Sequence, residues 1–189
     1  MELFLAILIG IGLSISAGFR VFTPMLVASI ASKLGWLPLS GGFEWIGSTP
    51  ALIAFSVAVV IEIASYYVPV IDNFMKALAT PLALIAGTIL TVSMIGVEDN
   101  AFLSWGMAIL TGGGAATASQ LTTAAVRGTS TVTTGGLANP ILSFIEDIGA
   151  VLLSIVSIAL PIVVVVLVII LVIVFVKMFS IIKRRFRTA

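Results

Sequence analysis

The sequence contains no cysteine and no histidine, and only 9% of its residues are charged. Without these two residue types the chain has no disulfide, no thiolate nucleophile, no histidine-ligated metal and no histidine-anchored haem. The formal net charge is +1, so no strong electrostatic field attracts nucleic acid. We therefore expect no metal, no other cofactor and no nucleic-acid partner.

Hydrophobic residues, in contrast, make up 60% of the 189 residues, and the mean hydropathy is +1.30. A soluble domain carries about 25% charged residues, and about 20 consecutive apolar residues span a bilayer. Several stretches of this chain approach that length. We predict an all-α, polytopic helical membrane protein with about six to seven membrane segments. Residues 1–189 would form a single transmembrane domain whose first partner is the lipid bilayer.

Proline, glycine and charged residues divide the apolar sequence into segments. The predicted segments up to residue 97 are about 3–18, 25–37, 51–68, a short interfacial helix over 69–80, and 81–97. From Pro140 the chain stays apolar to Ile182, which we interpret as one long helix kinked near Pro161. Four basic residues then follow: Lys183, Arg184, Arg185 and Arg187. By the positive-inside rule they place the carboxyl terminus in the cytoplasm, and we expect a multi-pass protein of the inner membrane.

Two arginines interrupt this apolar pattern in a similar way. Small residues precede Arg20, and Pro24 follows it closely; small residues also precede Arg127, with Pro140 further on. In both places a proline would open a new helix. We predict non-helical breaks from Arg20 to Pro24 and from Arg127 to Pro140. The sequence therefore indicates two pseudo-repeated halves, about 1–80 and 81–189, each with a broken or re-entrant helix.

The second predicted break lies within a stretch of small and hydroxylic residues, from Thr111 to Pro140. We interpret this stretch as a re-entrant polar loop. Part of it, Ser130 to Gly136, also resembles a cation selectivity filter, in which backbone carbonyls replace the water around an ion. The alternative for its glycines and alanines is close helix packing.

Each half also carries carboxylates that follow its arginine. Interrupted helices in corresponding positions of two halves point to a transporter binding site, and ionisable residues inside a membrane are functional candidates by default. We expect each arginine to turn inward and pair with one of Glu62, Asp72, Glu146 and Asp147. The alternative is that Arg20 snorkels to the headgroups and that the pairs are structural. The predicted substrate-binding residues are Arg20, Arg127, Glu62, Glu146, Asp147, Thr129 and Thr131.

These positions carry a resemblance to a known family. Gly18, Phe19 and Arg20 with Pro24 form the first match, and Glu62 with Pro69 and Asp72 forms the second. The third match is Arg127 with Pro140 and the Glu146–Asp147 pair. In this order the chain resembles the domain-of-unknown-function 4126 family of small bacterial membrane proteins. The resemblance implies the fold and the membrane location, and it implies no activity.

The function we expect is that of a small inner-membrane transporter or permeation protein with a central site lined by arginines and carboxylates. Two arginines beside broken helix ends favour an anionic or amphipathic substrate. The alternative is a non-catalytic subunit or assembly factor of a larger membrane complex, and a homo-oligomer is also open. We do not expect an enzyme, because no nucleophile, metal cluster or Gly-x-Ser-x-Gly setting stands out.

Overall fold

The computed structural model describes residues 2–65, 69–97, 100–164 and 166, and for Glu2 and residues 69–77 it describes the backbone alone. Within these residues there are seven α-helices, one 3₁₀ turn, one π-helical turn and no strand. The elements are α1 (Glu2–Phe19), α2 (Phe22–Lys33), η1 (Glu44–Gly47), α3 (Thr49–Ser65), α4 (Pro69–Ile95), α5 (Ala101–Ala108), the π-helix η2 (Ile109–Gly113), α6 (Gly114–Thr134) and α7 (Asn139–Ala159). The predicted all-α fold class is confirmed.

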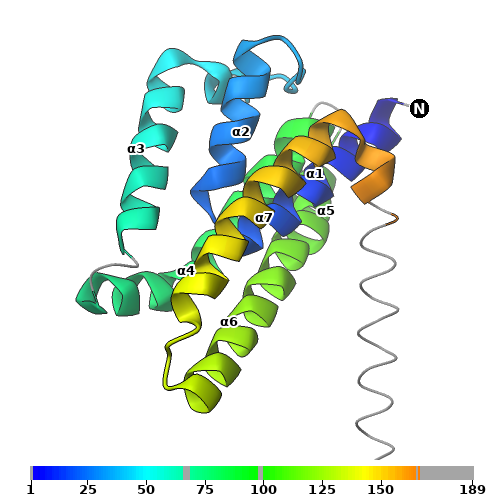
Figure 1. Cartoon of the computed structure of the whole chain (residues 1–189). Coiled ribbons are helices and arrows are strands. Elements are labelled where there is room, and N and C mark those ends of the chain that lie inside the picture. Colours follow the sequence, from blue (N-terminus) through cyan, green and yellow to red (C-terminus); the bar gives the residue numbers. More distant parts are fainter. Residues whose placement is uncertain (1, 66–68, 98–99, 165, 167–189) are drawn as a thin grey trace, which may run out of the picture.

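Helix α1 is the centre of the bundle. It packs against α4, α6 and α7, and Figure 1 shows it lying behind the α6–α7 pair. Two of its serines are fully buried. Ser14 Oγ lies 2.8 Å from the Gly87 carbonyl oxygen of α4, and Ser16 Oγ lies 2.7 Å from the Ala150 carbonyl oxygen of α7. Small polar residues therefore join α1 to two neighbours by hydrogen bonds, as membrane helices often do.

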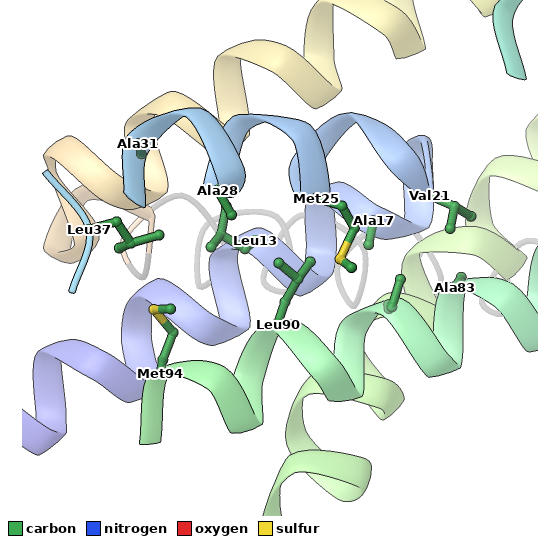
Figure 2. Close-up of a cluster of buried hydrophobic side chains, with 12 residues drawn as sticks. Leu13, Ala17, Val21, Met25, Ala28, Ala31, Leu37, Ala83, Leu90 and Met94 are labelled. Carbon is green, nitrogen blue, oxygen red and sulfur yellow. The ribbon is translucent and has the colours of Figure 1, made fainter. Parts of the chain in front are cut away.

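The apolar core lies between α1, α2 and α4. Figure 2 shows Leu13 of α1, Ala28 of α2 and Leu90 of α4 gathered in one cluster. The other buried members are Ala17, Val21, Met25, Ala31, Leu37, Ala83, Ala86, Met94 and Ala116. Five of these nine are alanines, and small side chains let the helix backbones approach closely.

The break predicted from Arg20 to Pro24 is present but shorter than predicted. Only Arg20 and Val21 are non-helical, α2 resumes at Phe22, and Pro24 lies in its first turn. A first turn tolerates proline because the N–H groups there have no helical acceptor. The predicted start of a helix at about residue 51 is also confirmed, since α3 begins at Thr49 with Pro50 in its first turn.

Pro81, however, does not begin a helix, so the predicted division at residue 80 is wrong. Residues 69–80 and the following span belong to one helix, α4, with Pro81 in its interior. Figure 1 shows the first turns of α4 running crosswise below the end of α3. Interior prolines are tolerated in apolar helices where neighbouring helices and hydroxyl side chains satisfy the freed backbone groups.

The predicted re-entrant loop is helical over most of its length. α5, η2 and α6 follow one another without interruption from Ala101 to Thr134, and only residues 135–138 are a turn. The break predicted from Arg127 to Pro140, and the comparison with a selectivity filter, are therefore wrong for residues 127–134. Glycine and threonine have weak helix propensity, but the threonines here donate their hydroxyls to the carbonyl four residues earlier. Close packing of the glycines on α4 stabilises the rest of this helical stretch.

Helix α7 also ends earlier than predicted. Leu160 has φ −139° and ψ 63°, so the helix stops at Ala159 instead of kinking, and a new helical turn begins at Pro161. The residue before a proline is driven out of the α region by the proline ring. The predicted continuation to Ile182 and the basic residues 183–187 lie outside the described residues.

Two helices are long and apolar enough to cross a membrane, by length and composition: Leu78–Ile95 of α4 and Asn139–Ala159 of α7. Shorter apolar helices cover Leu3–Phe19 and Thr49–Ser65. Of the α7 stretch only 22% is buried inside the protein, compared with 50% of the α4 stretch. The surface of α7 is consequently a wide apolar face, which includes Phe144, Ile148 and Leu152.

We expect Gly87→Ala to destabilise the bundle. A Cβ at Gly87 would lie 2.6 Å from both Ala116 Cβ and the Gly112 carbonyl oxygen, and overpacking of this kind costs about 1–3 kcal/mol. Gly106→Ala is the control, because no atom lies within 4 Å of its Cβ position. Thermal unfolding in detergent should show a lower midpoint for the first variant and an equal or higher midpoint for the second. Equal midpoints for Gly87→Ala and the parent would contradict the close approach of α4 and α6.

Candidate functional site

Arg20 lies at the break between α1 and α2 and is only 1% exposed. Its Nε donates to Asp147 Oδ1 of α7, and its Nη2 donates to the Ser143 carbonyl oxygen at 3.1 Å. Glu146 Oε2 lies 3.9 Å from the same Nη2 atom. The arginine is therefore turned inward, as predicted, and the snorkelling alternative is wrong for this residue.

Arg127 pairs with Glu146 between α6 and α7. Its Nε lies 2.9 Å from Glu146 Oε1 and 3.1 Å from Oε2, and its Nη2 contacts Oε2. The Nη2 atom also donates to Ser143 Oγ at 3.1 Å. The two side chains are 14% and 8% exposed. The predicted pairing is confirmed, but Arg127 lies in the interior of α6 and not at a helix break.

Glu62 has a different role from the one that the arginine pattern suggested. It is 4% exposed, and its carboxylate accepts the backbone N–H groups of Val21 at 2.8 Å and Phe22 at 3.2 Å. These two groups begin α2, which has no capping side chain at Val21. A carboxylate at a helix amino terminus satisfies free donors and complements the helix dipole. Glu62 therefore caps α2 from α3 and fastens the end of α3 to the α1–α2 break.

These groups surround a cavity of about 290 Å³. Four of the predicted residues line it: Glu62, Arg127, Thr131 and Glu146. Arg20 and Asp147 are not among the lining residues and lie behind Glu146, which Arg20 approaches. The full lining is Phe19, Val21, Glu62, Ala79, Thr80, Gln120, Thr123, Ala124, Arg127, Gly128, Thr131, Asn139 and Glu146. The polar side chains of both halves of the chain thus meet at one space.

Four polar lining residues were missed from the sequence: Thr80, Gln120, Thr123 and Asn139. Gln120, Thr123, Arg127 and Thr131 are spaced by three and four residues, which is the spacing of one helix face. This periodicity is visible in the sequence once residues 114–134 are treated as a helix and not as a loop. Thr80 and Asn139 carry no such signal, because they come from other helices.

Two predicted residues fall elsewhere. Thr129 lies two positions after Arg127, about 200° around the helix, on the outer face of α6 with Leu121 and Ala125. It therefore lies outside the cavity. Asp72 belongs to the part of α4 whose side chains are outside the described residues. Among the described residues, no group of three or more Asp, Glu, Cys or His side chains is arranged to hold a metal ion.

Comparison with known proteins gives one match. The model of a family described as a domain of unknown function (DUF4126) matches residues 7–180, which is most of the chain. No curated protein and no solved structure matches. The family match agrees with the resemblance seen at Arg20, Glu62 and Arg127, and its description names no substrate and no reaction.

The pairing of Arg127 with Glu146 predicts strong coupling between the two residues. Arg127→Ala should lower the free energy of unfolding by about 3–5 kcal/mol, because it leaves a buried carboxylate without its main partner. The double variant Arg127→Ala/Glu146→Ala should lose clearly less than the sum of the two single losses. Denaturant unfolding in mixed micelles measures all three, with Lys33→Ala at an exposed cation as the control. Additive losses would show that the pair contributes nothing.

The cap on α2 predicts a local effect of removing the Glu62 carboxylate. Glu62→Ala should speed amide hydrogen exchange at Val21 and Phe22 and lower stability by about 0.5–2 kcal/mol, as loss of a cap does. Glu62→Gln should have a smaller effect, because its amide oxygen still accepts one N–H group. Glu44→Ala, at a carboxylate that accepts the exposed Gly42 N–H, is the control. Unchanged exchange at Val21 and Phe22 in Glu62→Ala would remove the capping role.

Proposed function

Since the chain belongs to the DUF4126 family, whose name assigns no activity, we propose its function from the cavity: a small transporter or permeation protein of the inner membrane. The single observation that carries the proposal is the cavity of about 290 Å³ with Glu62, Arg127 and Glu146 in its wall. Charged groups around a space inside an apolar helix bundle are typical of solute and ion pathways. The proposal assigns no catalytic step to this space.

Membrane insertion is supported by the surface of the bundle. A core helix of a soluble protein is mostly buried, whereas α7 leaves most of its apolar surface uncovered by the described residues. Trp36, Trp45 and Trp105 are exposed, and Trp105 contacts Phe43 in the loop that precedes Trp45. These tryptophans gather at one end of the bundle, as interfacial anchors do. Lipid would cover the α7 face, and headgroups would surround the tryptophans.

The position of the charges along α7 supports a site within the bilayer. Glu146 lies seven residues after Asn139, about 10 Å along the helix at 1.5 Å per residue. If α7 crosses a hydrocarbon layer of about 30 Å, the carboxylate lies well inside it. The ion pairs with Arg20 and Arg127 then compensate the cost of these charges. The cavity beside them offers a polar solute the same surroundings.

The lining favours an amphipathic solute over a simple anion. Phe19, Val21 and Ala124 supply apolar contacts beside the polar groups. The Nε and Nη2 donors of Arg127 are directed to Glu146 and Ser143, so an anion would have to displace a carboxylate to reach them. We therefore propose a small amphipathic substrate, which is one of the two classes expected from the sequence.

The finer topology forms part of the proposal. We propose six to seven membrane segments and a cytoplasmic carboxyl terminus from the hydropathy pattern and the basic residues 183–187, and two related halves from the repeated order of arginine, proline and carboxylate. The arginines of the two halves do not occupy equivalent places, because Arg20 lies at a break and Arg127 inside α6. Any structural similarity between the two halves therefore has to be sought in their helices and not in the helix breaks.

Uptake into proteoliposomes tests the proposal. Thr123→Phe places a ring in the cavity, since Thr123 lines it and is 8% exposed. The adjacent Thr122→Phe is a matched control, because Thr122 makes the same hydroxyl bond to the carbonyl four residues earlier but faces outward. Across a panel of amino acids, alkylamines and short carboxylates, the parent and Thr122→Phe should transport a solute. Thr123→Phe should fall to the level of protein-free liposomes.

Two outcomes would contradict this proposal. Equal uptake by Thr123→Phe and the parent, with both variants eluting as the parent does, would remove the cavity from the pathway. No uptake of any solute, together with consistent co-purification of one larger complex in mild detergent, would favour the alternative role as a subunit or assembly factor.

A further inference from the structure

We propose that the cavity binds a small organic cation of the alkylammonium class, with the Glu62 carboxylate as its counter-charge. This inference rests on the proposed function, and it adds the charge of the substrate. Three features of the cavity carry it: the balance of charge, the hydrogen-bonding groups of the wall, and the size of the space.

Among the described residues, the charges around the cavity do not balance. The described residues of the cluster are three carboxylates, on Glu62, Glu146 and Asp147, and two guanidinium groups, on Arg20 and Arg127. Within this described set, the carboxylates exceed the guanidinium groups by one. Inside an apolar bundle an uncompensated charge is costly, and a bound cation would compensate it.

Glu62 is the carboxylate that can still take a cationic partner. Asp147 pairs with Arg20, and Glu146 pairs with Arg127. Glu62 makes its described hydrogen bonds to two backbone N–H groups, which offer the partial charge of a helix terminus and not a full positive charge. Each of its oxygens accepts one of these bonds, and a carboxylate oxygen can accept a second. Since Glu62 also lines the cavity, its carboxylate can accept a further hydrogen bond from a ligand in the proposed site.

The rest of the wall is rich in acceptors. The Thr123 hydroxyl donates to the Ser119 carbonyl oxygen at 2.8 Å, and the Thr131 hydroxyl donates to the Arg127 carbonyl oxygen at 2.9 Å. Asn139 Nδ2 donates to Thr131 Oγ1 at 3.0 Å. Asn139 Oδ1, in turn, is buried and accepts no hydrogen bond from the described residues. The hydroxyl hydrogens therefore point into the helix, and oxygen lone pairs remain for a ligand that donates N–H bonds.

The size and the apolar part of the wall restrict the cation. A volume of about 290 Å³ lies at the lower limit of small-molecule sites, which are about 300–1,000 Å³. Phe19, Val21, Ala79 and Ala124 supply the apolar lining. A primary ammonium group on a short alkyl chain fits both features, because its N–H groups meet the acceptors and its chain meets the apolar wall.

Binding of three ligands of equal chain length tests the charge. Propylammonium chloride, propan-1-ol and sodium propionate each have three carbon atoms and carry a positive, a neutral and a negative head. We expect titration calorimetry on the full chain in detergent, at constant ionic strength, to detect propylammonium at millimolar concentration and neither of the others. Glu62→Gln should weaken propylammonium binding by about tenfold or more, as removal of a charged partner does. Glu44→Gln, at an exposed carboxylate, should leave it unchanged.

The opposite results are equally clear. Binding of propionate as tight as that of propylammonium, binding of none of the three by the parent, or unchanged binding by Glu62→Gln would overturn the inference. If Glu62→Gln does not fold, Thr123→Phe replaces it and should abolish binding that Thr122→Phe retains; binding that survives Thr123→Phe would also overturn the inference.

The binding and transport results separate the two proposals. Binding of propylammonium by a protein that transports no solute would refute the transport function and support the cation site. Equally fast transport of propylammonium, propan-1-ol and propionate would support the transport function and refute the cation site.

Discussion

The burial of the Arg20 guanidinium is the constraint on which the rest of the structure depends. A charge that is 1% exposed is stable only with close carboxylate partners, and α7 supplies them through Asp147 and Glu146. Glu146 also holds Arg127 of α6. The same break that carries Arg20 frees the first N–H groups of α2, and Glu62 of α3 accepts them. One short interruption between two helices thereby determines where α3, α6 and α7 lie.

This arrangement requires helices that approach closely. Buried serines on α1 reach carbonyl oxygens of α4 and α7, and Gly87 leaves room for Ala116 and the π-turn at Gly112. In the proposed membrane environment, lipid offers little hydrophobic driving force between helices, so van der Waals packing and interhelical hydrogen bonds would supply much of the association. The scarcity of large side chains in the core is consistent with this environment. The larger apolar side chains are instead found on the outer faces of α3 and α7.

The cavity is a consequence of the same constraint. The buried arginines and carboxylates need polar partners inside the bundle. The helices that carry them therefore cannot pack together through apolar side chains alone. A polar space is left between α3, α4, α6 and α7. Its wall joins acceptor oxygens to a small apolar surface, which is the basis of the proposed function and of the proposed cation. The arginines contribute mainly by holding carboxylates in place, since their described hydrogen bonds go to the protein.

The sequence by itself determined the helical class, the break at Arg20, the start of α3 near Pro50 and the pairing of both arginines with carboxylates. The first three follow from local chemistry, and the pairing follows from the cost of an unpaired charge in an apolar chain, although the sequence left open which carboxylate each arginine meets. Only the tertiary structure decided that residues 111–134 are helical, because their threonines satisfy the helix backbone while their glycines pack on α4, and weak local propensity cannot show that contact. It also decided that Glu62 caps α2 and that Thr80, Thr123 and Asn139 meet Arg127 around one cavity. These residues come from separate helices, and nothing in the order of the chain records which faces of those helices point toward one another.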